Sequence, residues 1–229
     1  MADQAVGERT AGGRTAELLR RLGAVDSTSL ADAGPSLRVL PPGIAALRPG
    51  AKLVGTAVPV DSRDDLVPVL VGLRSAGPGD VLVVAGTPDR ALAGELFATE
   101  AARRGLAGIV IDGLCRDSRT LRSIDLPVFA RGVSPRAYGA TTLPVGDAPI
   151  LVGGVEVRPG DLVLADDDGV VLGSPDEVAT AIEGAEEIQR REEALRAAIE
   201  RGESIFDHLN LDEHLAGLGR GDDSRLRFS

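Results

Sequence analysis

The residues of this chain best suited to chemistry are one acid and one Arg-Asp pair. Glu95 is followed, after twenty intervening residues, by Arg116 and Asp117. Two carboxylates and a guanidinium in one pocket, beside the backbone amides of a helix start, suit a divalent cation and a small anionic substrate. Adjacent Arg and Asp residues also form ordinary surface ion pairs. The spacing therefore indicates a site only if the fold brings the loop that holds Glu95 close to the loop that holds Arg116 and Asp117.

The segment between these residues predicts that the loops meet. Residues 89–105 are expected to form a helix closed by Gly105, and the apolar run 107–113 is expected to form a strand. From Glu95, about ten helical residues carry the chain ~15 Å away from the start of the helix. About six strand residues then bring it back by ~20 Å, so the two distances nearly cancel. Because ligands collect beyond the carboxyl ends of strands in α/β sheets, we expect Glu95, Arg116 and Asp117 to face one pocket.

The remaining pattern predicts an α/β fold with a right-handed parallel crossover. Residues 155–173 predict a β-meander with turns at 159–161 and 166–169, and a long helix follows Ser174 and ends at Gly202. Further strands are expected over 51–60, 79–86 and 126–132, and further helices over 14–23, 27–33 and 64–76.

Composition limits the classes of function. The formal charge is -10 and aromatic residues make up 2%, so neither a basic surface nor a stacking platform for nucleic acid is expected. One cysteine excludes an intrachain disulfide. No signal peptide or apolar run long enough to cross a bilayer is recognised, which predicts a cytoplasmic protein without a membrane partner. We expect a frayed segment over residues 1–13, one domain over 14–202 and a C-terminal arm over 203–229.

Four blocks of the sequence resemble the RraA-like family, which contains the 4-hydroxy-4-methyl-2-oxoglutarate aldolases and regulators of ribonuclease E activity. The resemblance covers roughly residues 20–205. An acidic residue, twenty positions and then Arg-Asp mark the aldolase branch, and Glu95, Arg116 and Asp117 match that pattern. The blocks are PGDVLVVAG, ALAGELFATEAARRGLAGIVIDGLCRD, VFARGVSPRAYG and VRPGDLVLADDDGVV.

The resemblance implies a β/β/α swivelling-domain fold with flanking N- and C-terminal helices, assembled as trimers or hexamers. It implies a class II pyruvate aldolase that uses Mg²⁺, Mn²⁺ or another divalent cation, with oxaloacetate decarboxylase activity. Asp117 would anchor the metal, largely through waters, and Arg116 would bind the carboxylate and carbonyl end of the substrate. Glu192 matches the family position that supplies an acid to the metal site of a neighbouring subunit.

The same resemblance implies that backbone amides around Gly94, Glu95 and Leu96 complete the anion site. Independently of it, cleavage of a 4-hydroxy-2-oxo acid or loss of CO₂ from oxaloacetate leaves a pyruvate enolate, whose charge a metal and an arginine stabilise. A Schiff-base aldolase needs an activated lysine. Lys52 is the only lysine, and it starts a predicted strand without a neighbouring cation. Glu95 is a candidate helper for the base that removes the C4 hydroxyl proton.

Other readings stay open at this stage. A non-catalytic regulator that binds a ribonuclease E-like enzyme is the main alternative, although such regulators can lack the acid at the position of Asp117. A phosphohistidine carrier needs a histidine on a core loop, whereas His208 and His214 lie in the expected arm. Three substrates remain possible: 4-hydroxy-4-methyl-2-oxoglutarate, 4-carboxy-4-hydroxy-2-oxoadipate and oxaloacetate. Cys115 is expected to be a small packed side chain, and residues 166–168 a hairpin turn rather than a cation loop.

Overall fold

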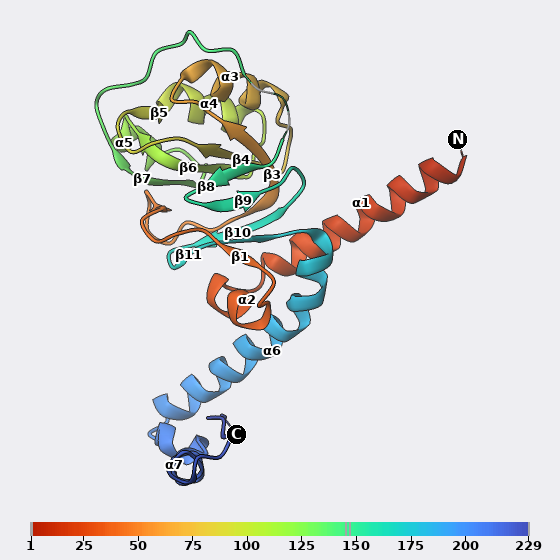
Figure 1. The fold of residues 1–229 in the computed structure, drawn as a ribbon, viewed down its shortest axis with the longest axis vertical. Helices are drawn as coiled ribbons and strands as arrows, with labels where there is room; N and C mark the ends of the chain where they lie inside the picture. The colour runs from red at the N-terminus through yellow and green to blue at the C-terminus, as the bar shows by residue number, and fades with distance from the viewer. Residues whose placement is uncertain (1, 145, 147, 229) are drawn as a thin grey trace. The chain divides into compact units, whose positions relative to one another are not determined.

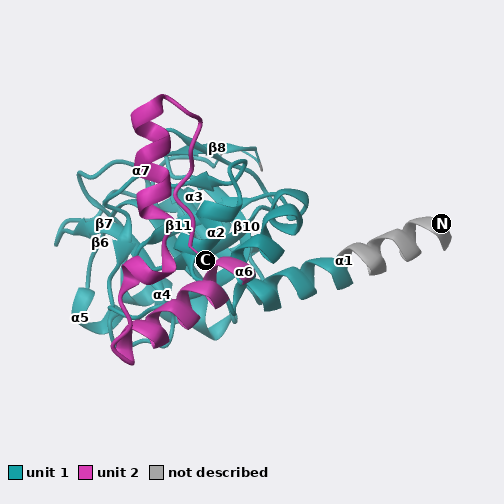
Figure 2. Ribbon diagram, turned by 90° about the horizontal axis from the view of Figure 1, so that it is seen from below, with its two compact units in different colours: residues 1–186 teal, residues 187–229 magenta. Residues whose placement is uncertain are grey.

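The computed structural model describes residues 2–144, 146 and 148–228, with only the backbone described for residues 2–11. The chain forms two compact units, residues 1–186 and 187–229 (Figure 2). The division falls inside helix α6 (Pro175–Glu200), whereas the predicted domain and arm meet just after this helix ends. Fraying of residues 1–13 stays a prediction, because Met1 and the side chains of residues 2–11 lie outside the described part.

A mixed β-sheet forms the centre of the first unit (Figure 1). Four neighbouring strands run parallel, which confirms the predicted parallel pairing: β3 (Leu53–Asp61), β4 (Asp80–Ala85), β6 (Gly108–Cys115) and β7 (Val128–Val133). Antiparallel strands extend the sheet on both sides: β1 (Arg38–Val39), β11 (Gly169–Gly173) and β10 (Leu162–Asp166) beyond β3, and β2 (Ala45–Ala46) beyond β7.

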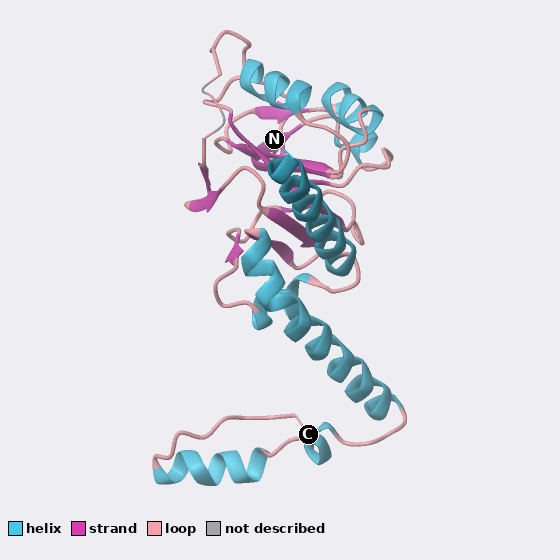
Figure 3. Ribbon diagram, turned by 90° about the vertical axis from the view of Figure 1, so that its right-hand side faces the viewer, coloured by secondary structure: helices cyan, strands magenta, loops and turns pink. Residues whose placement is uncertain are grey.

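Alternate residues of the parallel strands fill two different cores, which explains why these strands read as continuous apolar runs. On β4, Leu82 and Val84 face helices α3 (Leu66–Ser75) and α4 (Glu95–Arg103), which cover one face of the sheet (Figures 1 and 3). Val81 and Val83 face the other side and pack with residues of the hairpin β8 (Ile150–Val152) and β9 (Val155–Val157). Asp65 caps α3, so Pro68 falls in the first turn, where proline is tolerated.

A third cluster packs the β10–β11 hairpin against helix α1 (Ala2–Leu22), helix α2 (Ser27–Ala33) and the first turns of α6. The turn between the two strands confirms the hairpin expected over residues 166–168. Asp166 accepts hydrogen bonds from the amide and the hydroxyl of Ser27, at 2.8 and 2.5 Å. Asp167 accepts from the amide of Gly50. These acids therefore bind protein groups and tie the hairpin to α2 and to the loop before β3.

Two predictions of local structure are wrong. The helix expected over 89–105 starts at Glu95, because residues Ala91–Ala93 form a strand, β5, that pairs in parallel with β6. The expected meander is not continuous, because β9 pairs with β8 while β10 pairs with β3 and β11. Both errors concern strand pairing. The residues of β5 also fit a helix, and β10 pairs with β3, which is distant in the sequence.

The second unit contains the C-terminal turns of α6, a 3-10 turn at Ile205–His208 and helix α7 (Leu211–Arg220). The chain after α7 returns antiparallel to Leu209, which bridges to Phe228. The side chain of Asn210 fixes this return by accepting from the amide of Arg227 and donating to the carbonyl of Arg225. Among the described residues, no helix has both the length and the apolar character needed to cross a bilayer.

Candidate active site

The loops that carry the predicted site residues lie side by side at the carboxyl end of β6. The amide of Arg116 donates a hydrogen bond to the carbonyl of Ala93 at 2.9 Å, which ties the end of β6 to β5. The amide of Glu95, the first residue of α4, donates to the Asp117 carboxylate at 3.2 Å. Both contacts link residues that are more than twenty positions apart, so the fold joins the two halves of the motif.

The backbone at Asp117 directs its carboxylate toward α4. Asp117 adopts a left-handed conformation with φ 56° and ψ 36°, just before the short helix α5 (Ser118–Leu121). Aspartate tolerates this region better than most residues, and such conformations recur at functional sites. The Asp117 carboxylate then lies within reach of the Glu95 amide and 3.5 Å from the Nε atom of Arg116.

Gly94 makes room for this arrangement. A Cβ atom at position 94 would lie 2.5 Å from Oδ2 of Asp117 and 2.9 Å from Cγ of Arg116, which is closer than atoms can approach. Gly94 is also the N-cap of α4, so the partial positive charge of the helix start faces the carboxylate. The residue before the motif's acid must therefore lack a side chain for the Arg-Asp pair to sit against the helix.

A small cavity of about 50 Å³ opens between these loops. Four of the five predicted substrate-site and catalytic residues line it, namely Gly94, Leu96, Arg116 and Asp117. The remaining lining residues are apolar: Leu66, Ala91, Ala93, Phe97 and Ala137. The cavity is thus polar on the side of Arg116 and Asp117 and hydrocarbon elsewhere.

The other predicted residues take different positions. The side chain of Glu95 is exposed and does not line the cavity, so its amide rather than its carboxylate contacts Asp117. The Glu95 amide is already hydrogen-bonded to Asp117. The amide of Leu96, the next residue of α4, has no acceptor within the helix, so it is the nearest backbone donor left for a ligand. Glu192 is an exposed residue of α6 in the second unit. Its role toward a neighbouring subunit stays a prediction.

The donor set fits a weakly held, hydrated cation better than a fully protein-ligated one. Over residues 2–144, 146 and 148–228, no group of three or more His, Cys, Asp or Glu side chains could hold a metal ion. Magnesium commonly keeps several waters and uses only one or two carboxylates. The partly exposed carboxylate of Asp117 and the exposed one of Glu95 can serve in that way. Asp117 as the metal anchor stays a prediction.

Cys115 and Lys52, the two reactive side chains weighed in the sequence, both have structural roles. Cys115 is buried at the end of β6, and burial raises the pKa of its thiol to about 11. Lys52 donates hydrogen bonds to the carbonyls of Gly23 and Val25, at 2.9 and 2.6 Å, and so holds the chain after α1. Neither side chain lines the cavity.

Sequence reasoning missed two sets of residues around the site. Leu66 lies outside the four blocks that carry the family resemblance, and Ala137 lies inside the block VFARGVSPRAYG but was not assigned to the site; both line the cavity. Asp112, a buried acid inside the apolar run of β6, accepts hydrogen bonds from Arg131 and from the amide of Gly153. An acid within an apolar strand is a signal for a buried partner, and here it links β6, β7 and the β8–β9 turn.

A larger hollow of about 680 Å³ lies between β3, α3 and residues near the start of β8. Asp61 is the one ionisable side chain among its described lining residues, and none of the predicted site residues lines it. With Asp61 as its one described ionisable side chain, this hollow has no cationic group for a small anionic substrate and no second carboxylate beside the first. The smaller cavity beside Arg116 and Asp117 is therefore the candidate active site.

Known proteins resemble this chain over most of its length. A protein of Halalkalibacterium halodurans named "Putative 4-hydroxy-4-methyl-2-oxoglutarate aldolase" is 36% identical over 179 residues, which are 76% of this chain and 85% of that protein. The crystal structure of RraAS2 from Streptomyces coelicolor, described as an unusual member of the RNase ES inhibitor RraA family, is 32% identical. It matches 79% of this chain and 96% of its own with a TM-score of 0.69.

The RNA-processing inhibitor RraA from Thermus thermophilus is 33% identical, with a TM-score of 0.58 over 65% of this chain and 92% of its own. These structures confirm the predicted RraA-like fold with flanking helices. The family model for RraA-like proteins, described as Aldolase/RraA, matches residues 25–172, which include the whole Glu95–Asp117 motif. The chain is a member of the RraA-like family.

Proposed function

We propose that this protein is a divalent-metal-dependent aldolase that cleaves 4-hydroxy-2-oxo acids of the 4-hydroxy-4-methyl-2-oxoglutarate type to pyruvate and also decarboxylates oxaloacetate. The observation that carries the proposal is the Asp117 carboxylate, seated on the start of α4 beside Arg116 in the space that Gly94 leaves open. The aldolase names of curated relatives support the same assignment.

Arg116 binds the anionic end of the substrate. Its guanidinium contacts Asp117 at 3.5 Å and is 44% exposed, so N–H groups remain available for a carboxylate or a 2-oxo oxygen. The Leu96 amide and the positive end of α4 add to this site. A planar guanidinium matches a carboxylate with two parallel hydrogen bonds, which fixes the orientation of the reacting carbons.

The reaction requires a proton to leave the C4 hydroxyl while the C3–C4 bond breaks. The bonding electron pair passes to C3 and generates the enolate of pyruvate, which then takes a proton at C3. Glu95, whose exposed side chain lies between the cavity-lining residues Gly94 and Leu96 in the sequence, is the residue we assign to accept the hydroxyl proton, directly or through water. Oxaloacetate would lose CO₂ by the same transfer of electrons and give the same enolate.

Asp117, with Glu192 of a second copy, would hold the cation. When bound, a divalent ion supplies positive charge that stabilises the developing enolate and makes water more acidic. Asp117 is kept in place for this role by the Glu95 amide and by its own left-handed backbone.

Pyruvate release tests the proposal. The purified chain is assayed with 4-hydroxy-4-methyl-2-oxoglutarate, 4-carboxy-4-hydroxy-2-oxoadipate and oxaloacetate, with Mg²⁺ or Mn²⁺ and after chelation. We expect turnover of at least one substrate with metal and its loss in excess chelator. Undiminished turnover in chelator would contradict the metal requirement, and no turnover of any substrate would contradict the aldolase assignment.

Regulation of a ribonuclease is the second candidate function, because one structural relative is described as an RNA-processing inhibitor and another as an unusual member of the RNase ES inhibitor RraA family. It predicts that the chain slows cleavage of RNA by a ribonuclease E-like enzyme at stoichiometric concentration without turnover of 2-oxo acids. Asp117→Asn separates the two functions, because a regulator would keep its inhibition in this variant whereas the aldolase would lose activity.

A homotrimer or hexamer is part of the proposal, since Glu192 contributes only if a second copy is present. Light scattering is expected to give a mass of three or six chains at micromolar concentration. A monomeric mass together with full activity would remove Glu192 from the proposed metal site and leave the roles of Arg116 and Asp117 unchanged.

A further inference from the structure

One wall of the candidate active site is a segment without regular secondary structure, residues 134–142, here called the strap. It runs beside β5 as an additional extended chain. The Ala91 amide donates to the carbonyl of Arg136 at 2.7 Å, and the amide of Tyr138 donates to the carbonyl of Ala91 at 3.1 Å. Ala137, between these two bonds, is thereby fixed against the cavity that it lines.

The far end of the strap is fixed to α3. The Leu66 amide donates to the carbonyl of Gly139 at 2.8 Å. Asp65, only 3% exposed, accepts from the amide and the hydroxyl of Thr141, at 2.8 and 3.2 Å. Because both ends of the strap are held by hydrogen bonds, the wall formed by Ala137 has little freedom to retreat from a larger ligand.

The Tyr138 side chain adds a third attachment. Its hydroxyl lies 2.6 Å from the hydroxyl of Thr87, and Thr87 in turn donates to the carboxylate of Asp64 at 3.0 Å. Tyr138 also packs on the core beneath α3 and α4. The residue that follows Ala137 is therefore anchored by both polar and apolar contacts.

Small side chains set the depth of the cavity. Ala91, Ala93 and Ala137 contribute only methyl groups, beside the side-chain-free Gly94. The volume of about 50 Å³ leaves room for roughly one or two groups of the size of a water molecule or a methyl. One further carbon on any alanine of this wall would fill much of that space.

We infer that Ala137 is a specificity-determining residue that restricts the enzyme to 2-oxo acids whose C3 becomes an unsubstituted methyl group. This inference rests on the proposed function. The anionic end of the substrate faces Arg116, so its C3 end points to the apolar wall formed by Ala137 and Leu66. In the proposed substrates C3 already carries C4 and two hydrogens. A second carbon in place of one of these hydrogens would have to displace the fixed strap, which disfavours such substrates.

Exchange of C3 protons in heavy water, followed by proton NMR with added Mg²⁺, tests this inference. In the exchange the C3–H bond breaks, its electron pair forms the enolate, and a deuteron from the solvent adds at C3. Wild-type protein is given pyruvate or 2-oxobutanoate. When a C3–H bond takes the position of the C3–C4 bond that breaks in the aldol cleavage, 2-oxobutanoate must place its methyl group where pyruvate has a hydrogen. A missing or additional methylene in a tight pocket changes specificity by about 10- to 200-fold. We therefore expect pyruvate to exchange at least about 10-fold faster, as kcat/KM.

In Ala137→Gly, the preference for pyruvate over 2-oxobutanoate should fall by about 10-fold, because the C3 protons of 2-oxobutanoate exchange faster. In Ala137→Val, exchange of the C3 protons of pyruvate should be slower by a similar factor. Ala140→Val is the matched control, because Ala140 is an exposed strap residue that does not line the cavity, and it should keep the wild-type preference. Equal exchange of both acids by wild type, or an unchanged preference in Ala137→Gly, would overturn the inference while leaving the aldolase assignment intact. No exchange with pyruvate would reject both.

Discussion

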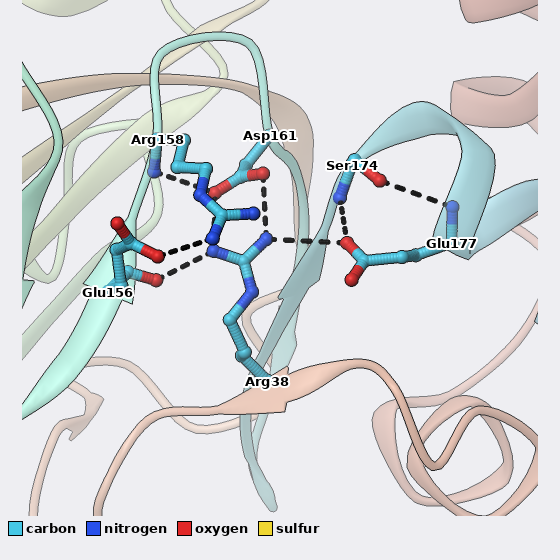
Figure 4. Close-up of polar contacts among 6 residues, drawn as sticks. All are labelled: Arg38, Glu156, Arg158, Asp161, Ser174 and Glu177. Atoms are coloured by element: carbon cyan, nitrogen blue, oxygen red, sulfur yellow. Dashed lines mark hydrogen bonds and ion pairs between the residues drawn. The ribbon is translucent and has the colours of Figure 1, made fainter.

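Arg38 pairs with Asp161 inside the first unit, and Arg116 pairs with Asp117 at its surface. The Arg38 guanidinium donates two hydrogen bonds to the Asp161 carboxylate, at 2.8 and 2.9 Å, with side chains 17% and 1% exposed (Figure 4). The Nε atom of Arg116 lies 3.5 Å from Asp117, and those side chains are 44% and 36% exposed. The same two residue types therefore meet in two different environments.

The buried pair makes its hydrogen bonds within the protein, although among the described residues the Nε atom of Arg38 is buried without a partner. Asp161 also accepts from the amide of Arg158 at 2.7 Å, and Arg38 also donates to the carbonyl of Glu156 at 2.7 Å (Figure 4). The surface pair is held mainly through the amide of Glu95, which leaves guanidinium and carboxylate atoms facing solvent. The first pair supports the fold, and the second is available to a ligand.

The largest expected difference between the buried pair and the surface pair is in the free energy of unfolding. Asp161→Ala leaves the Arg38 guanidinium buried without its carboxylate, and breaking a buried pair from one side costs about 3–5 kcal/mol. Urea unfolding should show this loss in the free energy of unfolding. Asp117→Ala is the comparison and should change it by less than ~1 kcal/mol, as for an exposed pair. Equal losses in the two variants would contradict the contrast.

The next largest effect is on turnover. Arg116→Ala removes the guanidinium that binds the anionic end of the substrate, and loss of such a donor lowers the rate by about 100- to 1000-fold. Pyruvate release measures kcat/KM, and the free energy of unfolding should stay near that of wild type. Arg119→Ala, which removes an exposed arginine of α5 outside the cavity, should retain full activity. Full activity of Arg116→Ala would show that the surface pair is an ordinary ion pair.

A change at Gly94 should affect activity and stability together. Gly94→Ala places a methyl group 2.5 Å from Oδ2 of Asp117, which is too close, so the carboxylate must move away from the start of α4. Forcing a group into such a contact costs about 1–3 kcal/mol. We expect a lower melting temperature and at least ~10-fold lower pyruvate release, for about 1.4 kcal/mol of lost positioning. Gly139→Ala is the control, since a Cβ there meets no atom within 4 Å.

The smallest effect concerns acid stability beside the buried pair. The amide of Ser174 donates to Glu177 at 2.7 Å, and Arg38 lies 3.5 Å away, so the pKa of the Glu177 carboxyl is held below its usual range (Figure 4). A folded-state pKa below the unfolded value of about 4.3 stabilises the fold above that pH, and the gain is lost as pH falls through the folded pKa.

Urea midpoints measured from about pH 6 to pH 3 should therefore fall more steeply for wild type than for Glu177→Gln, which lacks this titrating group. Parallel curves for wild type and Glu177→Gln would show that the acid adds no pH-dependent stability to the buried cluster.

The sequence predicted the meeting of the two site loops because the signals for it are local. Gly105 ends a helix, an apolar run follows at once, and parallel crossovers bring the strand ends to one edge. The strand at Ala91–Ala93 was missed because alanines also favour helix, and its assignment depends on pairing with β6. Gly94 lies at the boundary between strand β5 and helix α4, and it has no side chain whose pattern would indicate that boundary.

The walls of the site were beyond prediction for a different reason. The strap is held by backbone hydrogen bonds to β5 and α3, so the types of its side chains do not indicate where the segment runs. Arg38 and Asp161 are 123 positions apart, and no periodicity relates them. The exposed carboxylate of Glu95 was expected to face the pocket, yet in a helix start the amide and side chain point in different directions.

The burial of Cys115 gives this chain an internal reporter of motion at its candidate active site. Cys115 is the only thiol, it precedes Arg116 directly, it is buried, and burial raises the pKa of its thiol to about 11. A thiol-reactive dye can therefore attach only when the end of β6 separates from its neighbours. The rate of labelling, with and without a 2-oxo acid present, would time the opening of that edge without any engineered probe.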